Sequence, residues 1–289
     1  MTAVPLPYLL EGPRDGELVV LSGSLGSDLR MWDPQVGALT AAGYRVVRYD
    51  HRGHGQSPVP AGPYTLADLG ADGVELLDRV GAPQAHFVGL SLGGMVGIWL
   101  AQHVGHRLRS LTLCCTSAEL GPASGWADRA AAVRQRGMRA LSTAVVERWF
   151  TPQWRAAGPQ QVRYYEAMVA ATPAEGYAAC CEAIQTMDID SDLRSIRAPT
   201  LVIAGAEDPA TPPEHGRHLA AAIPAARLEI VSPGAHLANV ESPQQLNRLI
   251  LAQLGTSWPS ASAAQAAPRA DATACFGACP RGGGPTIRP

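Results

Sequence analysis

The sequence predicts an α/β protein with a mostly parallel central sheet, helices on both faces of the sheet, and a helical cap insertion. Short apolar runs bounded by turn residues have the length and the Val, Leu and Ile content of buried strands. These runs are residues 18–21, 44–49, 86–89, 108–115, 200–204 and 227–231. Helical patterns lie between or after them, at residues 68–80, 93–103, 214–222 and 243–254. Strands that alternate with helices indicate a parallel sheet covered on both faces.

One long stretch breaks this alternation. Residues 119–198 carry four helical patterns, at residues 126–137, 138–149, 159–171 and 174–187, and no clear strand. A helical insertion between two strands of such a sheet predicts a cap over the sheet edge. The expected organisation is therefore a core of residues 1–118 and 199–255, with a cap of residues 119–198.

The last residues of the chain differ in composition from the rest. Ala, Pro and Gly supply more than half of residues 256–289, which offer almost nothing to bury, so we expect a disordered tail. Cys275 and Cys279 lie there with three residues between them. A metal site needs about four ligands and no second pair accompanies these two, so no metal site is expected.

The overall composition excludes several functions. The formal net charge is −2, and this gives no basic excess for binding nucleic acid or an anionic membrane. All 23 basic residues are Arg, so no Schiff base, pyridoxal-phosphate anchor or P-loop lysine can form. No signal-peptide pattern, membrane-length apolar run or disulfide-type cysteine spacing is present. We expect a soluble cytoplasmic protein.

The strongest chemical signal is Gly89-Leu90-Ser91-Leu92-Gly93, which fits the pattern G-x-S-x-G. It directly follows a predicted strand and directly precedes a predicted helix, which is the context of a nucleophile elbow. In that sharp turn, the small residues at both ends let neighbouring backbone pass close by. The pattern predicts that Ser91 is a catalytic nucleophile.

A serine nucleophile needs a base, and the base needs an orienting acid, in the chain order Ser, acid, His. Glu207 and Asp208 follow one predicted strand, and Asp208 is preferred because it starts the turn before Pro209. His236 follows the last predicted strand, where a base is expected. The nearest rival histidines are His51, His54 and His86.

An oxyanion hole for this nucleophile needs two backbone N–H groups. One is expected from Leu92, the residue after the nucleophile, and the other from the loop after the first core strand. That loop, which we call the oxyanion loop, is residues 22–26, and Ser24 is the candidate donor. Its side chain matters little because the donor is the main chain.

These segments resemble the α/β-hydrolase superfamily, and within it the 3-oxoadipate enol-lactonases. The general resemblance rests on residues 50–57 (DHRGHGQS), on the elbow, and on residues 205–208 and 234–236. The specific resemblance rests on residues 22–35 (SGSLGSDLRMWDPQ), 89–95 (GLSLGGM) and 147–152 (ERWFTP). It covers roughly residues 7–254.

The resemblance implies the α/β-hydrolase fold and a serine hydrolase that opens 3-oxoadipate enol-lactone to 3-oxoadipate in aromatic catabolism, without a cofactor or metal. The implied partner is a small lactone with a free carboxylate, for which a cation is the natural ligand. The candidates are Arg30 beside the oxyanion loop, and Arg129 and Arg134 in the cap, with Trp126 as a wall of the pocket. The alternatives are a carboxylesterase or another small-molecule hydrolase, or a non-catalytic ligand-binding homologue.

Overall fold

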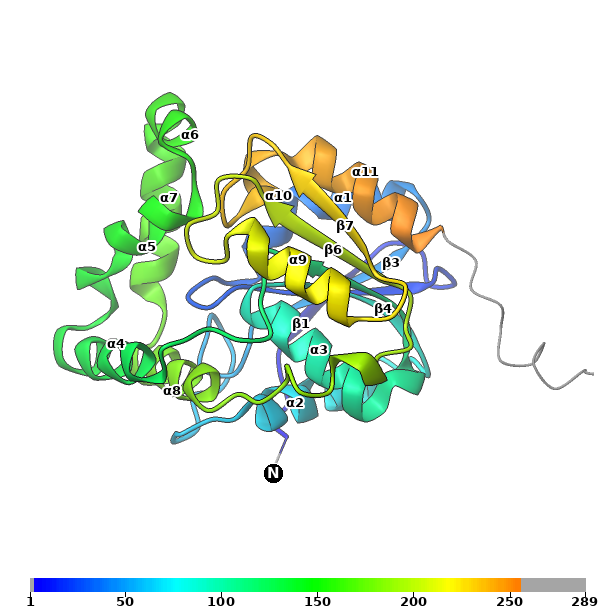
Figure 1. The fold of residues 1–289 in the computed structure, drawn as a ribbon, viewed down its shortest axis with the longest axis horizontal. Helices are drawn as coiled ribbons and strands as arrows, with labels where there is room; N and C mark the ends of the chain where they lie inside the picture. Colours follow the sequence, from blue (N-terminus) through cyan, green and yellow to red (C-terminus); the bar gives the residue numbers. More distant parts are fainter. Residues whose placement is uncertain (1–2, 256–289) are drawn as a thin grey trace, which may run out of the picture. The chain divides into compact units, whose positions relative to one another are not determined.

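The computed structural model describes residues 3–255, and a seven-stranded sheet runs through this part of the chain (Figure 1). The strand order is β1-β3-β2-β4-β5-β6-β7. β1 pairs with β3 in the antiparallel sense, and every other neighbouring pair is parallel. The strands are β1 (Tyr8–Glu11), β2 (Leu18–Ser22), β3 (Arg45–Tyr49), β4 (Ala85–Leu90), β5 (Leu108–Cys114), β6 (Thr200–Gly205) and β7 (Arg227–Val231).

The central strands are buried on both faces, which explains their continuous apolar runs. Every residue of β2, β4 and β6 is buried. The predicted fold class is confirmed, with one addition that the sequence did not predict. The short strand β1 is antiparallel at one edge; its Leu9 is exposed and its other residues are only partly buried.

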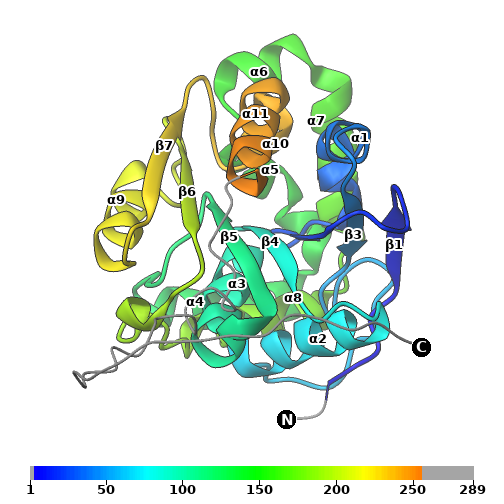
Figure 2. The same ribbon diagram turned by 90° about the vertical axis from the view of Figure 1, so that its right-hand side faces the viewer.

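Helices cover both faces of the sheet (Figure 2). On one face α1 packs against α11, and on the other α2 packs against α3, with α9 against β6 and β7. These helices are α1 (Asp33–Ala41), α2 (Leu66–Arg79), α3 (Leu92–Val104), α9 (Pro213–Ala222), the short α10 (Ala238–Glu241) and α11 (Pro243–Leu254). Single 3₁₀ turns are η1 (Leu29–Trp32), η2 (Gly105–Arg107), η3 (Met138–Ala140) and η4 (Leu193–Ser195). No helix within residues 3–255 is long and apolar enough to cross a membrane.

Between β5 and β6 the chain forms only helices, which gather at one end of the sheet (Figure 1). They are α4 (Ala123–Arg136), α5 (Ser142–Trp149), α6 (Pro152–Ala157), α7 (Pro159–Ala171) and α8 (Ala174–Gln185). α4 packs against α8, and α5 packs against α7. The helical pattern at residues 138–149 divides into η3 and α5. The domain boundaries at residues 119–198 stay a prediction, and the expected tail, residues 256–289, lies outside the described residues.

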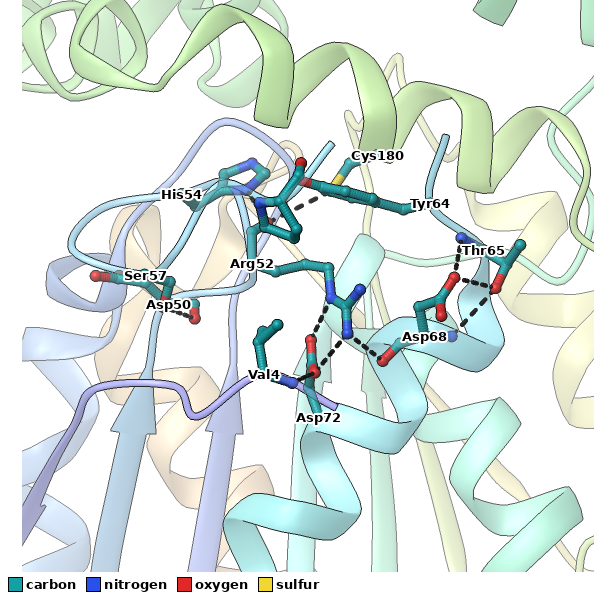
Figure 3. A network of polar contacts seen from close by, with 11 residues as sticks. Val4, Asp50, Arg52, His54, Ser57, Tyr64, Thr65, Asp68, Asp72 and Cys180 are labelled. Atoms are coloured by element: carbon teal, nitrogen blue, oxygen red, sulfur yellow. Dashed lines mark hydrogen bonds and ion pairs between the residues drawn. The ribbon is translucent and has the colours of Figure 1, made fainter. Parts of the chain in front are cut away.

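A buried ion pair ties the loop after β3 to helix α2 (Figure 3). Arg52 donates from Nε and Nη2 to the two carboxylate oxygens of Asp72, at 2.6 and 2.7 Å. The Val4 backbone N–H also donates to Asp72, at 2.8 Å. The Asp72 side chain is 1% exposed, so these bonds are shielded from water.

We expect Asp72→Ala to lower the free energy of unfolding by about 3–5 kcal/mol, because it leaves the Arg52 charge buried without its carboxylate. Urea unfolding followed by tryptophan fluorescence measures the change. Glu214→Ala is the matched control, since it breaks the exposed Arg217–Glu214 pair and should cost less than about 1 kcal/mol. Equal losses in the two variants would contradict the structural role assigned to Asp72.

Candidate active site

The turn between β4 and α3 presents Ser91 in a strained backbone conformation. Ser91 has φ 56° and ψ −115°, a region that residues other than glycine rarely occupy. A Cβ on Gly89 would collide with the backbone of Gly93, so only glycine allows this tight turn. Thr116 Oγ1, two residues after the end of β5, donates to the Ser91 carbonyl at 2.7 Å and holds the turn. The resulting geometry is that of a nucleophile elbow.

An acid follows β6 and a histidine follows β7, and their side chains meet. His236 Nδ1 donates to Asp208 Oδ2 at 2.8 Å, and both side chains are buried. Thr211 Oγ1 donates to the same oxygen at 2.6 Å. The other carboxylate oxygen, Oδ1, accepts the backbone N–H groups of Ala210 and Thr211, at 2.8 and 3.0 Å. The neighbouring Glu207 is exposed and takes no part.

The surroundings of Asp208 favour its charged form. Burial alone would raise the pKa of this carboxyl, but the facing His236 and the hydrogen bonds from His236 and Thr211 outweigh it and lower the pKa. A carboxylate held in this way orients the imidazole and stabilises its positive charge.

Ser91 and His236 line the same cavity, of about 250 Å³, under the helices inserted between β5 and β6. No hydrogen bond joins their side chains in the described part of the chain, and such contacts often tighten only when substrate is bound. The other lining residues come from the loop after β2, the stretch between β5 and β6, and the loop after β6. They are Ser24, Leu25, Leu120, Trp126, Arg129, Val145, Arg148, Trp149, Ile184, Pro209, Ala210 and Thr211.

The two expected oxyanion donors are Leu92, which follows Ser91 in the chain, and Ser24, which lines the same cavity as Ser91. Leu92 is the first residue of α3, so its N–H has no acceptor within its own helix. Ser24 lines the cavity, and its N–H points at Met31 Sδ, 3.2 Å away. A thioether sulfur is a weak acceptor, and an oxyanion in its place would form a stronger, charge-assisted hydrogen bond with the Ser24 N–H.

Two of the three candidate arginines do not reach the cavity. Arg30 is half exposed and binds Asp28 at 2.6 Å on the surface. Arg134 binds Glu175 at 2.7 Å and Glu182 at 2.5 Å. Both guanidinium groups are already neutralised by carboxylates outside the cavity, so the expectation that they contact substrate is corrected.

The third candidate, Arg129, lines the cavity together with Arg148, which sequence reasoning missed. Neither forms an ion pair with an acidic side chain within residues 3–255, and Arg129 Nε is buried without a hydrogen bond there. The Arg129 guanidinium lies over the rings of Trp126 and Tyr177, at 5.5 and 5.4 Å from their centroids. Burial, and then the charge of Arg129, lower the pKa of Arg148. Two cations facing one cavity favour an anionic ligand.

The rival histidines serve other contacts. His51 and His54 are buried against the oxyanion loop, where they bond to Gly23 and Gly26. His86, in β4, hydrogen-bonds Ser110 at 2.8 Å and contacts Glu17 at 3.3 Å. None of the three lines the cavity that holds Ser91.

The cysteines within residues 3–255 are free thiols in the core. Cys114, Cys115, Cys180 and Cys181 are all buried, and burial raises the pKa of each. Cys275 and Cys279 lie outside the described residues. No group of three or more His, Cys, Asp or Glu side chains in the described part is arranged to hold a metal ion.

Comparisons with known proteins place the chain in one family. The family model described as alpha/beta hydrolase fold matches residues 17–243. The chain is 40% identical to 3-oxoadipate enol-lactonase 2 of Acinetobacter baylyi, over 86% of this chain and 92% of that protein. It is 36% identical to the putative carbamate hydrolase RutD of Variovorax paradoxus, over 86% of this chain and 95% of that protein.

Solved structures agree with these sequence matches. The crystal structure of the enol-lactonase from Burkholderia xenovorans LB400 superposes with a TM-score of 0.85 at 40% identity. The match covers 87% of this chain and 96% of that one. A thermophilic esterase from Thermogutta terrifontis superposes with a TM-score of 0.81 at 27% identity, covering 86% of this chain and 92% of that one.

Proposed function

Because the chain belongs to the alpha/beta hydrolase family and is a hydrolase of esters or lactones, we propose that it opens 3-oxoadipate enol-lactone to 3-oxoadipate. The observation that carries this proposal is the pairing of two features in one cavity. Ser91 and His236 line it, and so do Arg129 and Arg148, which have no carboxylate partners in the described chain. A lactone with a free carboxylate fits both features.

In the proposed reaction, Ser91 attacks the lactone carbonyl while His236 takes the proton from its hydroxyl. Asp208 keeps His236 oriented and stabilises the imidazolium. The oxyanion is held by the N–H groups of Leu92 and Ser24. The ring opens as an enolate leaves, which is protonated by His236 or after release and becomes the ketone. Water then attacks the acyl-enzyme, with His236 again as the base.

The guanidinium pair supports an acidic substrate on energetic grounds. A buried carboxylate without a partner is expensive to bind, and Arg129 and Arg148 repel each other when the cavity holds no anion. Binding a carboxylate between them removes both costs. The carboxylate end of the lactone would then lie against the inserted helices, with its carbonyl towards Ser91.

We expect Arg148→Met or Arg129→Met to lower kcat/KM for the lactone about 10- to 150-fold, since a charge-assisted hydrogen bond contributes about 1.5–3 kcal/mol. Turnover of neutral 4-nitrophenyl acetate should change little, because the nucleophile and its base remain. The ultraviolet loss of enol-lactone and the release of nitrophenol measure the two reactions.

Arg30→Met and Arg134→Met are matched controls, because their charges are paired outside the cavity. They should leave both substrates within about twofold of wild type. If the cavity arginines slow acid and neutral substrates equally, the carboxylate clamp is wrong. Turnover of a carbamate or of simple esters, with none of the lactone, would instead favour the activities named for the other relatives.

A further inference from the structure

The loop after β3, residues 50–57, holds the loop that carries Ser24. The oxyanion loop is residues 22–26. His51 Nε2 lies 3.1 Å from the Gly23 carbonyl, and the Gly26 N–H donates to His54 Nε2 at 2.9 Å. Two backbone groups that flank Ser24 are therefore bound by two histidines from one neighbouring loop.

The partners of these histidines determine where their protons lie. A carbonyl oxygen can only accept, so His51 must carry its proton on Nε2. A backbone N–H can only donate, so His54 Nε2 must be unprotonated, and its proton lies on Nδ1, which faces the Arg52 carbonyl at 3.3 Å. The two imidazoles are neutral and in opposite tautomers.

Burial keeps both rings in that neutral state. Burial lowers the pKa of His54 to about 4, and burial together with the charge of His54 lowers the pKa of His51 to about 3. At neutral pH the lone pair of His54 Nε2 is therefore available to the Gly26 N–H.

The loop that carries these histidines is itself firmly held (Figure 3). Ser57 Oγ donates to the Asp50 carbonyl at 2.6 Å, and the Asp50 carboxylate accepts the Gln56 N–H at 2.9 Å. Arg52 is bound to Asp72 on α2. These bonds fix the loop that carries His54, and so they fix the position from which His54 contacts the oxyanion loop.

The Ser24 N–H has only a weak partner, the sulfur of Met31, which does little to fix its direction. The Ser24 carbonyl, by contrast, accepts Ser27 Oγ at 2.7 Å and the Ser27 N–H at 3.1 Å. The Gly23 carbonyl shares the planar peptide group of the Ser24 N–H, and it accepts the Gly93 N–H at 2.9 Å besides its contact with His51. The other end of the loop is held at Gly26 by His54. The orientation of the Ser24 amide therefore depends on the bonds at both ends of the loop.

We propose that His54 is a positioning residue for the oxyanion hole: by accepting the Gly26 N–H, its Nε2 fixes one end of the oxyanion loop, so that the Ser24 amide stays where an oxyanion can replace Met31 Sδ as its acceptor. The inference rests on the proposed hydrolase site, but not on the identity of its substrate. His54 lies outside the cavity and acts only through the oxyanion loop.

The test compares His54→Gln with His54→Asn. The Gln amide reaches the place of Nε2 and keeps an acceptor for Gly26, whereas the Asn amide reaches only the place of Nδ1. We expect His54→Asn to lower kcat for 4-nitrophenyl acetate at least tenfold with KM within about twofold, and at most by the roughly 10²–10³-fold of a wholly lost oxyanion donor. His54→Gln should retain most of kcat.

A second readout separates positioning from a general structural effect. Phenylboronic acid forms a tetrahedral adduct on a reactive serine, and its inhibition constant should rise in His54→Asn by the same factor as kcat falls. The binding of 3-oxoadipate, a ground-state ligand, should stay within twofold in both variants. Rates are expressed per active site, titrated with a fluorophosphonate.

Three results would overturn the assignment. They are equal kcat values in the two variants, a fall in kcat without weaker boronate binding, and a His54→Asn protein that does not fold beside a folded His54→Gln. The nitrophenyl ester keeps the test independent of the lactone. A wild-type protein that hydrolyses the ester but not the lactone would refute the proposed substrate and leave the assignment of His54 open to the same comparison.

Discussion

Ser91→Ala is expected to lower kcat by a factor on the order of 10⁶, the cost of losing the nucleophile of a serine triad. The Ser91 hydroxyl is the group that would form the acyl bond, and the elbow holds it at φ 56° beside the cavity that contains His236. Alanine keeps the backbone of the turn, so the fold should survive. The ultraviolet assay of enol-lactone loss measures the fall.

Ser24→Ala is the matched control for this experiment. Ser24 lines the same cavity, but its proposed contribution is its backbone N–H, which alanine retains. Its activity should stay within a few-fold of wild type. Labelling with a fluorophosphonate should be lost in Ser91→Ala and kept in Ser24→Ala. If Ser91→Ala kept more than about a tenth of the activity, the nucleophile would lie elsewhere.

The sheet could be predicted because parallel strands buried on both faces leave a strong sequence signal. β2, β4 and β6 are runs of apolar residues bounded by turns, and Ser91 and Asp208 come just after two of them. His236 comes after β7, an edge strand that is mostly exposed. Parallel strands end at one edge of a sheet, so residues just past different strands converge there. This rule is enough to predict from the sequence that Ser91, Asp208 and His236 lie close together.

Other elements left weaker signals. β1 has four residues, none of them fully buried, and it owes its place to pairing with β3 rather than to an apolar pattern. α1 buries only Gln35 and Leu39, so it lacks an apolar stripe. Both depend on tertiary contacts that a local pattern does not report.

The direction of the arginines could not be predicted either. Arg129 and Arg134 lie on the same helix, α4, yet Arg129 faces the cavity while Arg134 binds Glu175 and Glu182 on α8. Which side of α4 meets the cavity is decided by its packing against α8. Arg148 lies in residues 147–152, which contributed only to the family resemblance, and its lack of an acidic partner within residues 3–255 is visible only in three dimensions.

Asp208→Asn is expected to lower kcat by about 10⁴ by placing the wrong tautomer on His236. Oδ1 of Asp208 accepts two backbone N–H groups, from Ala210 and Thr211, so an asparagine must keep its oxygen at that place. Its NH₂ group then faces His236 Nδ1, where the carboxylate had accepted. Nδ1 becomes the acceptor, and the proton moves to Nε2, which can no longer receive a proton from Ser91.

The size of this effect separates an orienting acid from a nearby charge. Glu207→Gln removes a neighbouring but exposed carboxylate and should leave kcat within about twofold of wild type. Asp208→Asn should bind 3-oxoadipate as wild type does, because the Arg129 and Arg148 wall is untouched, while fluorophosphonate labelling slows in parallel with kcat. If Asp208→Asn retained more than about a tenth of wild-type kcat, or if Glu207→Gln proved the more damaging change, His236 would be oriented by another group, and the acid assigned here would be wrong.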